Sequence, residues 1–197
     1  MAARQASRAG SSLLWRAGGG RCLLMSEIEG EHGASDALMR DPERLVRLYA
    51  EGLKAVHSVS AADCPFDRRL RVKMDEARIR AESGLVDSED FEEAYRGRSP
   101  FELLRLLEEQ APVDEDLVFT HGDYCMPNFL VRDGRRSGFI DWAGAGIADR
   151  YQDLALAVRS LRHNGLGDYA PLFAATYGLP EFDPGKVEFY ILLDEFF

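Results

Sequence analysis

An acidic and an amide side chain stand close together in the segment FTHGDYCMPNFL, residues 119–130. Asp123 is followed five positions later by Asn128, and the sequence from there, NFLV-RDGRR-SGFID, predicts a β-hairpin that ends in Asp141. Because a hairpin brings the outer ends of its strands together, we expect Asn128 and Asp141 to be neighbours. Two carboxylates and an amide oxygen suit a Mg²⁺ ion that also binds phosphate. One carboxylate then remains to accept a proton from an attacking hydroxyl, which is the chemistry of phosphoryl transfer.

Each of these residues, taken alone, also has a structural explanation, since aspartates at strand ends often cap helices or close turns. Their joint spacing is more specific than any one of them. His121 and Asp123, four further residues, Asn128 and then Asp141 on the next hairpin resemble the catalytic loop of protein kinases. The spacing therefore favours function over turn formation.

Two glycine-containing motifs fail as nucleotide-binding signatures. WAGAGIAD, residues 142–149, lacks the third glycine of a dinucleotide site, and AGGG, residues 17–20, lacks the Gly-Lys-Ser/Thr of a P-loop. We predict plain turns at both places.

Composition bounds the class of protein. The chain has 197 residues, 46% of them apolar, which is enough for one domain with a core, and no apolar run is long enough to span a membrane. Its net charge of −10 argues against nucleic acid as a partner. Residues 1–24 contain four arginines and no acid, so the acidic charge lies in the remainder. That acidic body suits a cationic ligand, although solubility alone would explain it.

The three cysteines, at positions 22, 64 and 125, are odd in number and widely spaced, which predicts neither a disulfide framework nor a zinc site and fits the reducing cytoplasm. The acid-free start resembles an organelle transit peptide, but its glycines and polar residues fit a disordered leader as well. We expect a disordered leader over residues 1–22, a short strand over 23–30 and the main body over 31–197.

Capping residues and apolar spacing predict a mainly helical body around the hairpin. Asp41 and Pro42 fit the start of a helix, and Ser99, Pro100 and Glu102 form a capping box. The predicted helices cover residues 41–59, 67–84, 99–110, 149–163 and 183 to the terminus, and a strand is expected at LVFTHGD. The fold class is therefore α+β, mostly helical with a central β-hairpin.

Four segments together resemble the aminoglycoside 3′-phosphotransferases, antibiotic-resistance kinases with a protein-kinase-like fold: HGDYCMPNFLV, GFIDW, ADRYQDLALAVRS and LLDEFF. The HGD motif alone would also be consistent with choline, homoserine or macrolide kinases. The resemblance runs from about Leu23 to Phe197 and implies a kinase-like C-terminal lobe that phosphorylates an aminoglycoside hydroxyl with ATP. At Gly144 the chain departs from many relatives, which have an arginine there in the phosphate- or acceptor-side network.

The resemblance also implies roles for individual residues. Asp123 would orient the sugar hydroxyl and accept its proton, and Asn128 and Asp141 would hold Mg²⁺ against the ATP phosphates. Backbone groups of Ser26 and Ile28, in the hinge-like LMSEIEG, would meet the adenine. The matches to the aminoglycoside pocket are Glu92, Glu93, Arg159, Asp194, Glu195 and the carboxylate of Phe197.

The acidic end of the last helix supports a cationic ligand independently. Asp194, Glu195 and a free carboxylate stand at a helix C-terminus, where each negative charge costs on the order of 0.3–1 kcal/mol. Aminoglycosides are polyamines and would offset that cost. The alternative is a frayed, solvated tail, although the aromatic pair Phe196-Phe197 favours packing.

The resemblance begins at the hinge, so the N-terminal lobe of a kinase is not expected from residues 1–22, which contain no lysine. Two hypotheses remain open. The chain is an aminoglycoside kinase whose given sequence lacks that lobe, or it is a non-catalytic remnant that binds a polycation or a protein partner. ATP consumption with kanamycin and Mg²⁺ distinguishes them.

Overall fold

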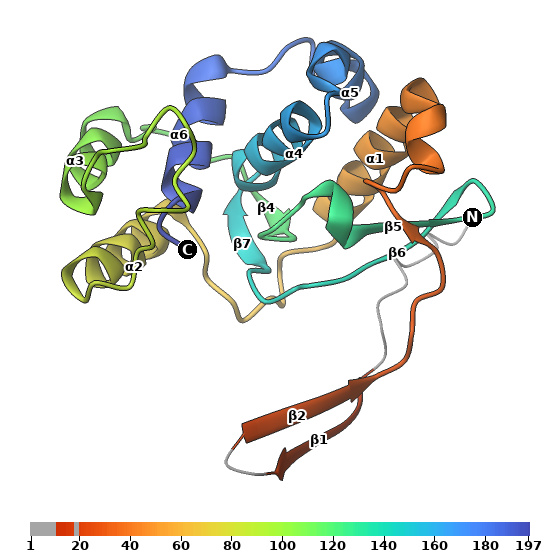
Figure 1. Ribbon diagram of the computed structural model, residues 1–197, viewed down its shortest axis with the longest axis horizontal. Helices are drawn as coiled ribbons and strands as arrows, with labels where there is room; N and C mark the ends of the chain where they lie inside the picture. Colours follow the sequence, from red (N-terminus) through yellow and green to blue (C-terminus); the bar gives the residue numbers. More distant parts are fainter. Residues whose placement is uncertain (1–10, 18–19) are drawn as a thin grey trace.

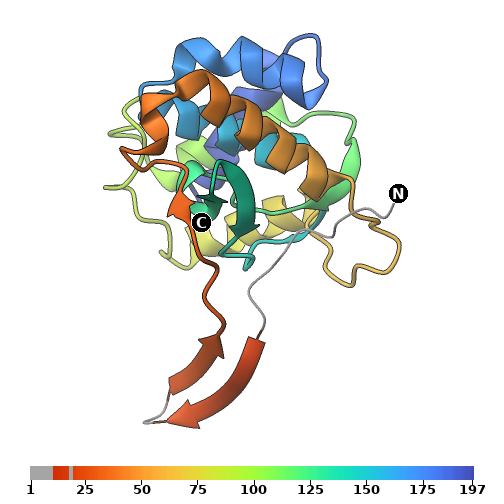
Figure 2. The same cartoon turned by 90° about the vertical axis from the view of Figure 1, so that its right-hand side faces the viewer.

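The computed structural model describes residues 11–17 and 20–197. A helical body surrounds small antiparallel sheets, and one hairpin stands away from it (Figures 1 and 2). The helices are α1 (Pro42–His57), α2 (Leu70–Glu82), α3 (Pro100–Gln110), α4 (Tyr151–His163), α5 (Ala170–Tyr177) and α6 (Pro184–Asp194). Short 3₁₀ turns lie at η1 (Leu38–Arg40), η2 (Met126–Asn128) and η3 (Gly167–Tyr169). The predicted α+β class is confirmed.

The helix ends follow the capping residues of the sequence. Asp41 accepts a hydrogen bond from the backbone nitrogen of Arg44 at the start of α1, and Ser99 and Glu102 form both bonds of the capping box of α3. All five predicted helices are present within a few residues of their expected bounds. Helix α5 was not predicted, because APLFAATY is apolar almost throughout and shows no amphipathic repeat.

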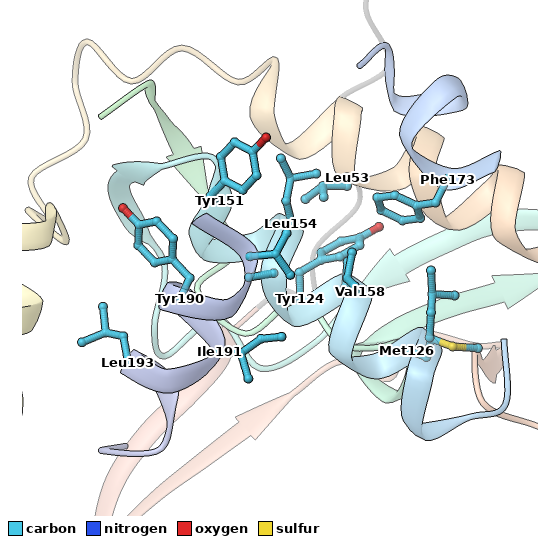
Figure 3. Close-up of a cluster of buried hydrophobic side chains, with 14 of the residues drawn as sticks. Leu53, Tyr124, Met126, Tyr151, Leu154, Val158, Phe173, Tyr190, Ile191 and Leu193 are labelled. Carbon is cyan, nitrogen blue, oxygen red and sulfur yellow. The ribbon is translucent and has the colours of Figure 1, made fainter. Parts of the chain in front are cut away.

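Helix α4 lies at the centre of the core. Ten of its 13 residues are buried, so its polar side chains must find partners inside the protein. Figure 3 shows its Leu154 and Val158 gathered with Leu53 of α1, Phe173 of α5 and Ile191 of α6. Helix α6 and the turns η2 and η3 pack against this enclosed helix.

Two sheets frame the loop that carries Asp123. Strand β4 (Leu117–Thr120) pairs with β7 (Gly146–Asp149), and β5 (Phe129–Arg132) pairs with β6 (Arg135–Phe139) and with β3 (Glu31–His32). The β5–β6 pair is the predicted hairpin. The second half of residues 142–149 is strand β7 rather than the plain turn we expected. Because β4 leads into the loop and β5 leads out of it, residues 121–128 are fixed at both ends.

The N-terminal hairpin corrects part of the expected boundaries. Strand β1 (Ser11–Ala17) pairs antiparallel with β2 (Gly20–Met25), so much of the expected disordered leader is a β-ribbon, and the strand expected over 23–30 ends at Met25. The predicted turn at 17–20 falls partly on residues 18–19, and the start of the leader on residues 1–10; both stretches lie outside the described residues. Within the described ranges, no helix combines the length and apolar character needed to cross a bilayer.

A reciprocal pair of tyrosines joins α1 to the loop. The hydroxyl of Tyr49 donates to the backbone oxygen of Tyr124 (2.8 Å), and the hydroxyl of Tyr124 donates to the backbone oxygen of Tyr49 (2.7 Å). Both side chains are buried, and their rings stack with centroids 4.7 Å apart. The pair fixes the residue next to Asp123 in place.

We predict that Tyr49→Phe lowers the free energy of unfolding by about 1–3 kcal/mol, because the buried Tyr124 oxygen loses its donor. Urea unfolding followed by circular dichroism measures the change. Tyr169→Phe is the matched control, since no described residue is hydrogen-bonded to the Tyr169 hydroxyl. Equal midpoints for the two variants would contradict the prediction.

Candidate active site

Two adjoining cavities meet at the loop between β4 and β5. The first has a volume of about 390 Å³ and the second of about 510 Å³. Asp123, Asp194 and Phe197 line both cavities, and Asp141 lines the first. The second is also lined by three further predicted residues, Glu92, Arg159 and Glu195. Most of the residues predicted from the sequence therefore surround one continuous space.

Asn128 orients the carboxylate of Asp123. Its side-chain nitrogen donates to Asp123 Oδ2 (2.7 Å) and to the Asp123 backbone oxygen (3.0 Å). The turn η2, which contains Pro127, brings the two residues together across the loop. One oxygen of Asp123 is thereby held, and the other is left for a substrate.

Asp141 stands where β6 meets the start of β5. The backbone nitrogen of Ile140 donates to the backbone oxygen of Asn128 (3.1 Å), so the hairpin ends adjoin as expected. Asp141 has a left-handed backbone (φ +59°), which directs the chain out of the strand, and its carboxylate makes no hydrogen bond or ion pair with another described residue.

The donor set around Asn128 and Asp141 fits a hard cation. In the described part of the chain, no group of three or more His, Cys, Asp or Glu side chains is placed to hold a metal ion. The Asn128 side-chain oxygen and the Asp141 carboxylate have no protein partner among the described residues. Two such oxygens suit Mg²⁺, which takes its remaining ligands from water and phosphate.

Buried Asp153 of α4 holds the backbone of the loop. Its carboxylate accepts hydrogen bonds from the backbone nitrogens of His121 (2.7 Å) and Gly122 (2.8 Å) and contacts His57 Nε2 (3.0 Å). Tyr177 lies 2.7 Å from the other ring nitrogen of His57. Since a carboxylate only accepts, His57 carries a proton on Nε2 and donates it to Asp153. This role of Asp153 was not predicted, because its partners lie between 31 and 96 residues away in the chain.

Neither His121 nor Cys125 is suited to reactive chemistry here. Burial lowers the pKa of His121, and its Nδ1 accepts from the backbone nitrogen of Asp123 (3.3 Å), so the ring is a neutral structural group. Burial, together with the nearby Asp123, raises the pKa of the Cys125 thiol to about 12, which keeps it protonated. Asp123 is therefore the remaining candidate for a base in this loop.

Gly122 and Gly144 make a backbone-to-backbone contact beneath the first cavity. Gly122 has φ +88°, and a Cβ there would lie 2.1 Å from the Gly144 oxygen. A Cβ on Gly144 would lie 3.0 Å from the Gly122 oxygen. Gly144 is therefore tightly packed against Gly122 in this chain.

The second cavity is acidic around a central arginine. Arg159 pairs with Asp194 (2.5 Å) and more distantly with Glu92 (3.7 Å), which also lies 3.5 Å from His163. The Glu92 backbone nitrogen donates to Glu195 Oε2 (3.0 Å). Burial, with repulsion from Glu92 and Asp194, raises the pKa of Glu195 to about 7.

Several lining residues were not predicted from the sequence. His163 stands four residues after the predicted Arg159 on α4, a spacing that places both on one helix face and could have been noticed. The other unpredicted groups include Asp87, Asp90, Arg68, Lys73 and Arg80.

Four predicted residues line neither cavity. Asn128 is hydrogen-bonded to Asp123 but does not itself line a cavity. Glu93 is exposed and follows the cavity-lining Glu92 in the chain. Ser26 and Ile28 belong to the stretch between β2 and β3, which has no regular secondary structure. Their expected role toward adenine remains a prediction.

We predict that Asp153→Asn lowers the free energy of unfolding by about 1.5–3 kcal/mol, because three hydrogen bonds to a buried charge are weakened or lost. Thermal unfolding gives the change in stability. Asp168→Asn, at an exposed position, should leave the melting temperature within error. An Asp153 variant as stable as that control would exclude the anchoring role.

Known proteins resemble this chain over most of its length. The chain matches the phosphotransferase enzyme family, APH, over residues 5–190. An aminoglycoside 3′-phosphotransferase of Niallia circulans is 46% identical over 181 residues, covering 91% of this chain and 69% of its own length.

Two solved structures extend the comparison to the fold. The aminoglycoside-3′-phosphotransferase of type VIII has a TM-score of 0.82 at 33% identity, over 93% of this chain and 73% of its own. Aminoglycoside phosphotransferase APH(3'')-Id from Streptomyces rimosus, in complex with ADP and streptomycin, has a TM-score of 0.82 at 28% identity, over 95% and 74%.

Fold and site together define a kinase-type phosphotransferase, and the predicted protein-kinase-like C-terminal lobe is confirmed. The chain belongs to the APH phosphotransferase enzyme family.

Proposed function

We propose that the protein transfers the terminal phosphoryl group of ATP to a hydroxyl of an aminoglycoside antibiotic. One observation carries the proposal: Asp123 lines both cavities, with Asp141 in the first and the acidic cluster around Arg159 in the second. A base in that place stands between a phosphate on one side and a polyamine on the other. The named relatives, which are aminoglycoside phosphotransferases, support the same reaction.

In this mechanism the acceptor hydroxyl lies against Asp123. The carboxylate takes the hydroxyl proton while the hydroxyl oxygen attacks the terminal phosphorus, and the bond to the bridging oxygen breaks as ADP leaves with the electron pair. Asn128 holds Asp123 Oδ2, which leaves Oδ1 toward the hydroxyl. Asn128 and Asp141 would hold Mg²⁺, which supplies positive charge against the phosphates when bound.

The second cavity would hold the amines of the acceptor. Glu92, Asp194 and Glu195 present three carboxylates, and Arg159 keeps two of them in place before a ligand arrives. Ser26 and Ile28 would meet the adenine through their backbone groups. Use of ATP is in keeping with the cytoplasm, where the free thiols of the three cysteines would stay reduced.

We predict that Asp123→Asn lowers kcat for kanamycin phosphorylation by about 100-fold or more, the usual contribution of a general base, with little change in the KM for kanamycin. Kanamycin-dependent ADP release measures turnover, and mass spectrometry identifies the phosphorylated product. Asp133→Asn, on the exposed hairpin turn, is the control.

Retained turnover in the Asp123 variant would exclude that residue as the base. If the unmodified chain bound kanamycin without transferring phosphate, the polycation-binding remnant would be the better description.

We predict that the affinity for kanamycin gains a pH dependence from Glu195. A carboxyl with a pKa near 7 is mostly neutral at pH 6 and ionised at pH 8, so its attraction for an ammonium rises through this range. Calorimetry at pH 6 and pH 8 compares the unmodified protein, Glu195→Gln and the surface control Glu188→Gln. Because the amines of the drug titrate too, the informative quantity is the change in Kd between pH 6 and pH 8, compared among the three proteins. The same pH dependence in all three proteins would refute the assignment.

A further inference from the structure

The acids of the second cavity come from two segments that are far apart in the sequence. Glu92 lies on the loop between α2 and α3, while Asp194 and Glu195 lie at the end of α6. The three carboxylates are close enough for Glu195 to accept from the Glu92 backbone and for Asp194 and Glu92 to share Arg159. Like charges repel at this range, so other groups must hold the two segments together.

Arg159 offsets part of that repulsion but does not fix the backbone. It contacts carboxylate oxygens, which are also the atoms that an incoming ammonium would need. A group that holds the segments while the acceptor is bound has to contact their backbone instead.

Arg80 of α2 makes those backbone contacts. Its guanidinium donates to the backbone oxygen of Leu85 (Nη2, 3.1 Å) and to the terminal carboxylate of Phe197 (Nη2, 3.3 Å), and its Nε donates to the backbone oxygen of Phe196. Leu85 begins the acidic loop, and Phe196 and Phe197 directly follow Glu195. One rigid, planar cation therefore bonds to both acid-bearing segments.

Lys73 supports the same segment from the same helix face. It stands seven residues, about two turns, before Arg80, and its Nζ lies 3.5 Å from the centroid of the Phe197 ring. Burial lowers the pKa of Lys73, while Asp194 and Glu76 favour its charged form. Figure 1 shows the end of the chain beside α2.

We propose that Arg80 and Lys73 are positioning residues that set the affinity for the polycationic acceptor by holding the loop around Glu92 and the segment 194–197 at a fixed separation. The inference rests on the proposed function. Both side chains act through the backbone, the terminal carboxylate or the Phe197 ring, and the side-chain carboxylates of Glu92, Asp194 and Glu195 remain available to amines. The rest of α2 offers a contrast: Arg78 faces away from the site and pairs with Glu108 of α3 (2.8 Å).

The test compares Arg80→Met, Lys73→Met and Lys73→Arg with the control Arg78→Met. Calorimetry measures the Kd for kanamycin, steady-state kinetics separates KM from kcat, and hydrogen exchange reports on the backbone of residues 85–97 and 194–197. We expect Arg80→Met to raise the Kd about tenfold or more and to speed exchange in both segments, with kcat nearly unchanged. Lys73→Met should raise the Kd about three- to thirtyfold, and Lys73→Arg should restore it, because a cation over the ring is retained.

Two outcomes would overturn the inference, and they can be told apart. If Arg80→Met and Arg78→Met bind kanamycin equally well, Arg80 has only a structural role and the proposed function still stands. If the unmodified chain binds no kanamycin, the proposed function fails and the inference fails with it. Should Arg80→Met not fold, Arg80→Lys replaces it, since an ammonium cannot reproduce the planar contacts to the oxygens of three residues; an unchanged Kd in that variant would also count against the proposal.

Discussion

The hydrogen bonds between the Asp153 carboxylate and the loop backbone are the constraint on which the site depends. A buried carboxylate is costly without partners, and Asp153 obtains them from two consecutive backbone nitrogens and from His57. The loop must keep one shape to satisfy that charge. Because Asp153 lies on the enclosed helix α4, the position of Asp123 is tied to the centre of the core.

Charge is arranged differently in the two halves of the site. Among the described residues, the Asn128 side-chain oxygen and the Asp141 carboxylate have no protein partner, which suits a divalent cation and its phosphates. Around Glu92 and Asp194, the carboxylates are crowded and partly neutralised by Arg159, so each is held in place but remains able to attract another cation. Asp123 lines both cavities, and in the proposed function it would stand between a phosphate side and an amine side.

The sequence predicted the features that depend on local spacing. The hairpin was recognisable because Asp133 and Gly134 can both adopt the left-handed backbone of a tight turn, and both do so. Asp123 and Asn128 were recognisable because four residues separate a carboxylate from its amide partner on one loop. Asp153 was not, because its partners come from other elements and an acid near the start of a helix is common.

The positioning role of Arg80 was hidden for a similar reason. Helix α2 has several basic residues, and only the packing of the chain end against it distinguishes Arg80 from the solvent-facing Arg78. The ribbon formed by β1 and β2 was missed because its glycines and arginines gave no strand alternation. Long-range packing determines the role of Arg80 and the position of the ribbon. The periodicity of the sequence carries no information about such packing.

The contact between Gly122 and Gly144 has a consequence for drug design. This floor of the first cavity is made of main chain, and a substituent on Gly122 would collide with the opposite strand of backbone. An inhibitor bound to this surface would contact main-chain atoms, which are present whichever amino acid occupies the position. Escape mutants could not remove the contact by trimming a side chain, and enlarging one would distort the turn that carries the base.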